Sequence, residues 1–246
     1  MTGKSIRILT VTLAFLGVLF LLQPAALADP VKLTLTQPPG GNVYDGIYLS
    51  PYYGMIGTAT ASVPIICDDF FDDTYIGEQW QATVANGSAA AATSWQKDYQ
   101  GTTLTQDYDA IAYLAQQLLT LPQGDQADQA LDSFAIWDIF DDTGVNTWLT
   151  VDYASSGGAA FYTKVNNAAT SALNAALTAP VQGDRSILTI YTPTGTPNGY
   201  SGPPQQFVTV STPEASSLAN LAVDLLLLAG AVFFVCRRRL TSGLSN

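Results

Sequence analysis

Two short acidic runs hold most of the side chains that could do chemistry in this sequence. They span Cys67–Thr74 (CDDFFDDT) and Trp137–Gly144 (WDIFDDTG), and each contains Phe-Asp-Asp-Thr. Carboxylate oxygens are the ligands that calcium prefers, and a pair of carboxylates can hydrolyse a glycoside. The residues that we consider for calcium are Asp68, Asp69, Asp72, Asp73, Asp141 and Asp142. For glycoside hydrolysis they are Asp68, Asp69, Asp141 and Asp142. A third interpretation is structural, as solvated turns and helix caps.

Cys67 is the other residue with reactive potential. It ends the apolar run Pro64–Cys67, and the second cysteine, Cys236, lies in the apolar stretch near the C-terminus. Free cysteine is among the most buried residue types, so the run predicts a buried thiol in a strand. No internal disulfide is expected from two cysteines in such different places.

The composition excludes several function classes. The chain has 246 residues and no histidine, which removes Ser-His-Asp and Cys-His catalytic pairs and histidine-based zinc sites. Nine Lys and Arg stand against 20 Asp and Glu, so we expect no nucleic-acid partner. We predict that the protein is not an enzyme, with calcium as the one cofactor considered.

The hydrophobic pattern predicts strands, then helices, then strands again. Alternating runs begin at Val31 and Val43, followed by the apolar run from Pro64 and a run from Glu78. Helical spacing follows over Gln106–Leu119, from about Gln126 and over Ala159–Leu177. Strand periodicity returns at Ser186 and Gln205, across a loop rich in Pro and Gly. We therefore expect an α+β fold, a β-sandwich or barrel with a helical insert.

Both ends of the chain carry apolar runs that suggest export. Residues 1–28 have a positive start, an apolar middle over Ile8–Leu22 and small residues at Ala26 and Ala28, as in a secretory signal peptide cut by signal peptidase. Near the other end, Leu218–Cys236 is long enough to span a bilayer and precedes Arg237, Arg238 and Arg239. By the positive-inside rule these arginines stop the helix on the cytoplasmic side. Residues 29–211 should form one ectodomain.

The C-terminal region resembles the PEP-CTERM sorting signal of Gram-negative bacteria. The features that carry the resemblance are Pro213 and Glu214, the short apolar helix and the arginine cluster, and Ala215 stands where the family usually has proline. The resemblance covers residues 212–246. It implies that an exosortase cuts near the Pro-Glu pair, after transient anchoring in the inner membrane. It also implies a place on the cell surface or in a biofilm matrix, with extracellular polysaccharide or surface proteins as partners.

The ectodomain resembles the thioester domain of bacterial surface adhesins over roughly residues 51–210. The resemblance rests on Cys67 with its acidic run, on the helix containing Ile111–Leu114, and on Ala135-Ile136-Trp137. In that family a cysteine is bonded to a glutamine four residues before the tryptophan. Here that position is Ser133, and Gln129 lies one helical turn earlier. The resemblance supports the fold, while serine has no acyl group with which to form the bond.

Together these features predict an exported surface or matrix protein that acts by binding or by structure. The first alternative is a covalent adhesin that uses Cys67, with Gln129 as its acyl donor. The second alternative is a secreted glycosidase that depends on the carboxylates.

Overall fold

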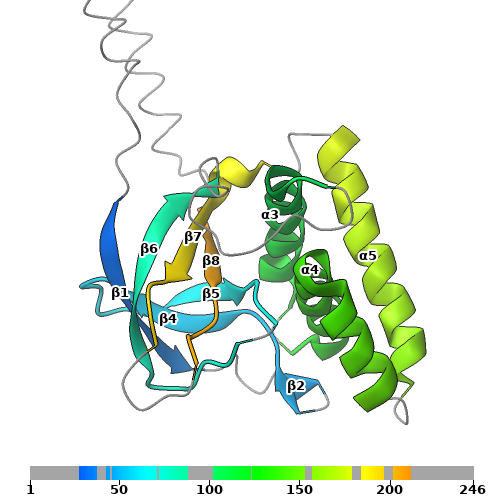
Figure 1. Cartoon of the computed structure of the whole chain (residues 1–246), viewed down its shortest axis with the longest axis horizontal. Coiled ribbons are helices and arrows are strands. Elements are labelled where there is room, and N and C mark those ends of the chain that lie inside the picture. Colours follow the sequence, from blue (N-terminus) through cyan, green and yellow to red (C-terminus); the bar gives the residue numbers. More distant parts are fainter. Residues whose placement is uncertain are drawn as a thin grey trace, which may run out of the picture.

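The computed structural model describes residues 28–37, 43–44, 46–70, 72–87, 102–122, 124–152, 157–178, 184–196 and 202–211. Within these residues a closed six-stranded barrel stands beside a layer of helices (Figure 1). The α+β class is therefore confirmed, and the β part is a barrel. The two-residue strands β2 and β3 form a separate hairpin.

The barrel strands are antiparallel to their neighbours all the way round. They are β1 (Ala28–Gln37), β4 (Tyr52–Ile56), β5 (Val63–Cys67), β6 (Gln79–Asn86), β7 (Leu188–Pro193) and β8 (Phe207–Val210). Their order round the barrel is β1-β4-β5-β8-β7-β6, and β6 pairs with β1 to close it. Alternate side chains face inward, since Trp80 and Ala82 of β6 are buried while Gln79 and Gln81 are exposed.

Three helices lie between β6 and β7 in the described part of the chain, as the expected helical insert. They are α3 (Leu104–Thr120), α4 (Gln126–Thr147) and α5 (Gly158–Thr178). The helix α3 begins two residues before the predicted Gln106 because Thr103 and Gln106 form a capping box. A π-helical turn, η2 (Trp148–Asp152), continues α4, and a 3₁₀ turn, η4 (Arg185–Ile187), leads into β7.

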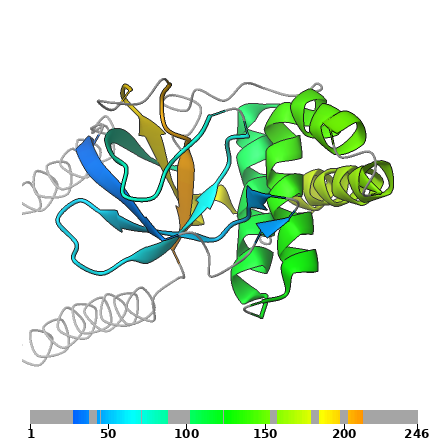
Figure 2. The same ribbon diagram turned by 90° about the horizontal axis from the view of Figure 1, so that it is seen from below.

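The predicted strand from Val43 is divided into β2 (Val43–Tyr44) and β3 (Ile47–Tyr48). Gly46 turns the chain between them with a φ of 93°. This hairpin leaves the barrel and packs on the helical layer (Figure 2). Tyr44 stacks on Phe161 of α5 with ring centroids 4.6 Å apart.

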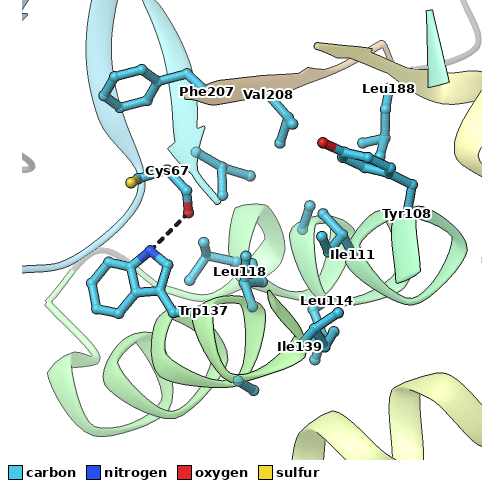
Figure 3. Close-up of a cluster of buried hydrophobic side chains, with 14 of the residues drawn as sticks. Cys67, Tyr108, Ile111, Leu114, Leu118, Trp137, Ile139, Leu188, Phe207 and Val208 are labelled. Carbon is cyan, nitrogen blue, oxygen red and sulfur yellow. Dashed lines mark hydrogen bonds between the residues drawn. The ribbon is translucent and has the colours of Figure 1, made fainter. Parts of the chain in front are cut away.

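The hydrophobic core lies between the barrel and the helices (Figure 3). Ile111 and Leu114 of α3 and Trp137 and Ile139 of α4 are buried against β5, β7 and β8. The apolar spacing that predicted α3 and α4 therefore reflects the sides of these helices that face the core.

The strand β1 begins, and the strand β8 ends, at the same rim of the barrel. Ala28 pairs with Val84 near the end of β6, and Val210 pairs with Leu188 at the start of β7. On β6 and β7 these positions lie toward the same end, because Thr189, next to Leu188, pairs with Asn86, two residues beyond Val84.

The predicted export signals fall almost entirely outside the described residues. These are the signal peptide over residues 1–28, of which Ala28 alone is described, and the sorting signal over residues 212–246 with Pro213, Glu214, Arg237, Arg238 and Arg239. Among the helices that are described, none combines the length and apolar character needed to span a bilayer.

Candidate functional site

Cys67 lies at the end of β5, fully buried between the barrel and the helices. Its amide donates to Ser50 Oγ at 3.1 Å, and its carbonyl accepts a hydrogen bond from Trp137 Nε1 at 3.1 Å (Figure 3). Its thiol donates to the carbonyl oxygen of Asp69 at 3.0 Å. The buried thiol that the apolar run predicted is confirmed, with each of its polar groups hydrogen-bonded.

Burial raises the pKa of the Cys67 thiol well above its ordinary value, and the nearby Asp69 raises it further. The thiolate is the nucleophilic form of cysteine, so a raised pKa keeps this residue unreactive at neutral pH. In this structure Cys67 is a free thiol.

Ser133 of α4 is joined to Cys67 through Ser50. The amide of Ser50 donates to Ser133 Oγ at 3.1 Å, while Ser50 Oγ accepts the hydrogen bond from the Cys67 amide. All three residues are 0% exposed, so the bonds are made away from water. The serine at the expected glutamine position therefore connects α4 to the segment before β4.

Gln129 lies one helical turn before Ser133 and is also buried. Its Oε1 atom accepts no hydrogen bond within the part of the chain that the structure describes. A buried amide oxygen without a partner is costly in free energy.

Aromatic rings enclose this region. Phe134 stacks on Trp148 at 5.4 Å and meets Trp137 edge to face at 5.0 Å. Phe70, which follows the first pair of aspartates, lies 5.4 Å from Trp137. Such contacts hold α4, η2 and the segment after β5 in a fixed arrangement.

The first acidic run begins in buried positions, so its interpretation as solvated turns is wrong for Asp68 and Asp69. Asp68 Oδ2 accepts hydrogen bonds from Gln206 Nε2 at 3.0 Å and from the Tyr108 hydroxyl at 3.4 Å. Burial raises the pKa of Asp68 to about 8, and the neighbouring Asp69 adds to the rise. At neutral pH this carboxyl is therefore mostly protonated.

Asp69 holds the segment just before β8 in place. Its Oδ2 accepts from the amide of Gln206 at 3.4 Å, and its carbonyl oxygen accepts from Gln205 Nε2 at 3.0 Å. Its Oδ1 accepts from the amide of Asp72 at 3.4 Å. Farther along the same run, Asp72 is half-buried and Asp73 is exposed.

The second acidic run lies in α4 and contacts α5. Asp141 leaves helical geometry with φ −143° and ψ 64°, and its Oδ1 accepts from the amide of Gly144 at 2.9 Å, as a helix cap does. Asp142 Oδ1 accepts a hydrogen bond from the Tyr162 hydroxyl of α5. The cap interpretation is confirmed at Asp141.

Sequence reasoning did not single out Gln206, Tyr108, Ser50 or Asp138. Asp138 is buried, its Oδ2 accepts from Asn166 Nδ2 at 3.4 Å, and burial followed by the charge of Asp142 raises its pKa to about 7. Periodicity could have suggested Asp138, because it follows Trp137 in an otherwise apolar stretch of helix. Gln206 and Ser50 act through contacts distant in sequence, for which no local pattern exists.

The described residues include no group of three or more Cys, Asp or Glu side chains placed to hold a metal ion. Asp68 and Asp69 instead accept hydrogen bonds from the residues just before β8 and from α3, while Asp141 and Asp142 accept from their own helix and from α5. The calcium site stays a prediction that these contacts do not favour.

No protein-family model and no curated protein matches the sequence. Among solved structures, the chain is similar to the N-terminal thioester domain of fibronectin-binding protein SfbI from Streptococcus pyogenes, with 13% identity and a TM-score of 0.42. That match covers 78% of this chain and 100% of the domain. The chain is also similar to the N-terminal domain of the Streptococcus pyogenes pilus tip adhesin Cpa, with 10% identity, a TM-score of 0.43 and coverage of 77% and 97%. With TM-scores below 0.5, these similarities assign neither a fold family nor a function to this chain.

Proposed function

We propose that the protein is exported, processed by an exosortase, and acts at the cell surface or in the extracellular matrix as a non-catalytic binding or structural component. The export part of this proposal rests on the signal-peptide pattern and on the Pro213-Glu214 sorting signal. The non-covalent, non-catalytic part rests on the contacts of Cys67 and of the aspartates.

The observation that carries the non-covalent role is the hydrogen-bonded chain from Cys67 through Ser50 to Ser133. A thioester needs an acyl group beside the thiol, and the expected position holds a hydroxyl that already accepts from the Ser50 amide at 3.1 Å. The thiol itself donates to Asp69 and is held in its protonated form by burial. Both features favour a structural cysteine.

The surroundings of Asp68 argue against a role for this residue in glycoside hydrolysis. Asp68 is 0% exposed, and its carboxyl is enclosed by Gln206 and Tyr108. A general acid must reach the glycosidic oxygen, which a carboxyl without solvent access cannot do.

One observation favours the alternative of a covalent adhesin. Gln129 is buried on α4 with an Oε1 that has no partner in the described part of the chain. Its side-chain amide is the acyl donor that a Cys67 thioester would need, and forming that bond would release one ammonia.

Intact mass spectrometry distinguishes the non-covalent role from that of a covalent adhesin with a Cys67 thioester. We would measure the full-length chain carrying Cys236→Ser, whose one cysteine is Cys67, before and after alkylation under denaturing conditions. The proposal predicts the full mass and one added alkyl group. A mass lower by one ammonia, together with resistance to alkylation, would establish the thioester. In that case Gln129→Ala should restore the full mass and the alkylation.

Export and processing are tested separately in the producing cell. Wild-type protein should appear outside the inner membrane at a mass that lacks both the leader and the residues after the Pro-Glu pair. Replacing Pro213 and Glu214 by alanine should leave the C-terminal segment attached. If both forms keep the tail, exosortase processing is wrong.

A further inference from the structure

The outer face of the barrel carries a groove across β1. Two adjoining cavities of about 400 and 700 Å³ open there, and Lys32, Gln79 and Gln81 line both of them. Volumes of this size are typical of sites for small molecules or for short segments of a polymer. We refer to the two cavities together as the β1 groove.

Strand register explains why polar side chains gather in the β1 groove. Lys32 pairs with Gln81, and Thr34 pairs with both Gln79 of β6 and Met55 of β4. Directly paired residues share a face of a sheet, so these side chains all lie on the outer face. Thr34 is largely covered there, with 7% of its surface exposed, while Lys32, Gln79 and Gln81 are exposed. The intervening Leu33, Leu35 and Trp80 are buried. Beyond β6, Thr194 extends the lining, and its hydroxyl donates to the Gln81 carbonyl at 3.1 Å.

The β1 groove differs in charge from the rest of the molecule. Residues 29–211 contain 18 Asp and Glu against Lys32, Lys97, Lys164 and Arg185, yet no carboxylate lines either cavity among the described residues. Arg185 is engaged by Asp109, whereas Lys32 is exposed and its Nζ donates only to the neutral Gln79 Oε1, at 3.3 Å, among the hydrogen bonds of the described residues. An anionic ligand repelled by the acidic surface would thus meet an ammonium here.

We propose that the β1 groove binds a segment of an acidic polysaccharide of the polyuronate type. The sugar carboxylate pairs with the Lys32 ammonium, and the sugar hydroxyls bond with the amides of Gln79 and Gln81, which both donate and accept. Neighbouring strands are about 4.8 Å apart, so the polymer can extend across several strands. This inference rests on the proposed function, to which it adds a site and a ligand class.

Calorimetric titration of the full-length chain with an oligogalacturonate tests the proposal. We expect binding that weakens with added salt, and much weaker binding of the same oligomer after its carboxyl groups have been reduced. Lys32→Gln should lower the affinity for the oligogalacturonate about tenfold, since a charge-assisted hydrogen bond is lost. The matched control is Lys164→Gln, which removes the same charge from an exposed position on α5 and should change the affinity less than twofold.

Two results would overturn the assignment of the β1 groove. One is equal affinity of Lys32→Gln and Lys164→Gln for the oligogalacturonate, which would place binding elsewhere. The other is no binding of the oligogalacturonate by the wild type. Retention of the full-length chain by matrix polysaccharide from the producing cells is the separate readout for a binding role in the matrix, as the proposed function allows. If the matrix polysaccharide still retains Lys32→Gln while the wild type does not bind the oligogalacturonate, the assignment of the β1 groove is wrong and the proposed function stands. If both fail, polysaccharide binding is wrong as well.

Discussion

Ser133 has a structural role that a substitution can measure. Ser133→Ala leaves the buried amide of Ser50 without its acceptor, at an expected cost of about 1–3 kcal/mol in the free energy of unfolding. Denaturation by urea gives this value, with Ser171→Ala at an exposed position of α5 as the control. A change no larger than that of the control would mean that Ser133 is dispensable to the network around Cys67.

Asp68 should make the stability of the protein depend on pH. Its pKa is about 8 in the folded state and about 3.9 in an unfolded chain, so the folded state binds the extra proton between these values. The stabilising contribution of Asp68 is therefore complete below about pH 3.9. It is lost progressively as the pH rises from there to about 8. The expected loss is about 1.4 kcal/mol per pH unit over this window.

Asp68→Asn removes this titration and should flatten the pH profile, with the variant gaining on the wild type as pH rises. Urea denaturation at several values between pH 4 and 9 measures the profile, with the exposed Asp73→Asn as the control. The flattening should be partial, because Asp132 and Asp138 keep pKa values of about 7 that act in the same direction. Parallel profiles for the wild type and Asp68→Asn would show that Asp68 is ionised in the folded protein.

At the scale of elements, the kink in α4 depends on a glycine. A Cβ atom at position 144 would lie 1.8 Å from Asp141 Oδ2, far inside contact distance. Alanine normally stabilises a helix relative to glycine, but here we expect Gly144→Ala to cost about 1–3 kcal/mol through this clash.

Thermal or urea denaturation of the double variant Asp141→Ala Gly144→Ala separates the clash from other effects. Removing the carboxylate should recover much of the stability lost in Gly144→Ala. If the changes in the free energy of unfolding caused by the two substitutions simply add, the Asp141 carboxylate is not what requires glycine at position 144.

At the scale of the whole molecule, one ion pair links the helical layer to the barrel. Asp109 of α3 accepts from Arg185 Nη1 at 3.0 and 2.9 Å and from the Arg185 amide at 3.1 Å, just before β7 begins. The side chains are 31% and 18% exposed, for Arg185 and Asp109 respectively, so solvent screens part of the attraction.

Substitutions of Asp109 separate charge from hydrogen bonding. Asp109→Asn keeps an acceptor for the amide and should cost about 1 kcal/mol in the free energy of unfolding, while Asp109→Ala should cost about 1 kcal/mol more. Urea denaturation in low and high salt measures both, and salt should reduce only the difference between Asp and Asn. Equal stability of the wild type and both variants would show that the ion pair between Asp109 and Arg185 does not stabilise the fold.

Much of the fold follows from the sequence because periodicity reports which face of an element is buried. Gln79 and Gln81 alternate with Trp80 as barrel strands require, and the stripe from Tyr108 to Leu118 identifies α3. The burial of Asp68 and Asp69 was not predictable in this way. Their partner Gln206 is more than 130 residues away in the chain, and only the closing of β5 against β8 brings it near.

The closed ring of strands limits how copies of this protein can associate. In an open sheet the outermost strand has unpaired amides and carbonyls, on which another chain can continue the sheet. Here each of the six barrel strands pairs on both sides. The barrel therefore offers no strand as a template for amyloid-like growth. Any assembly that uses the barrel must form through its side chains.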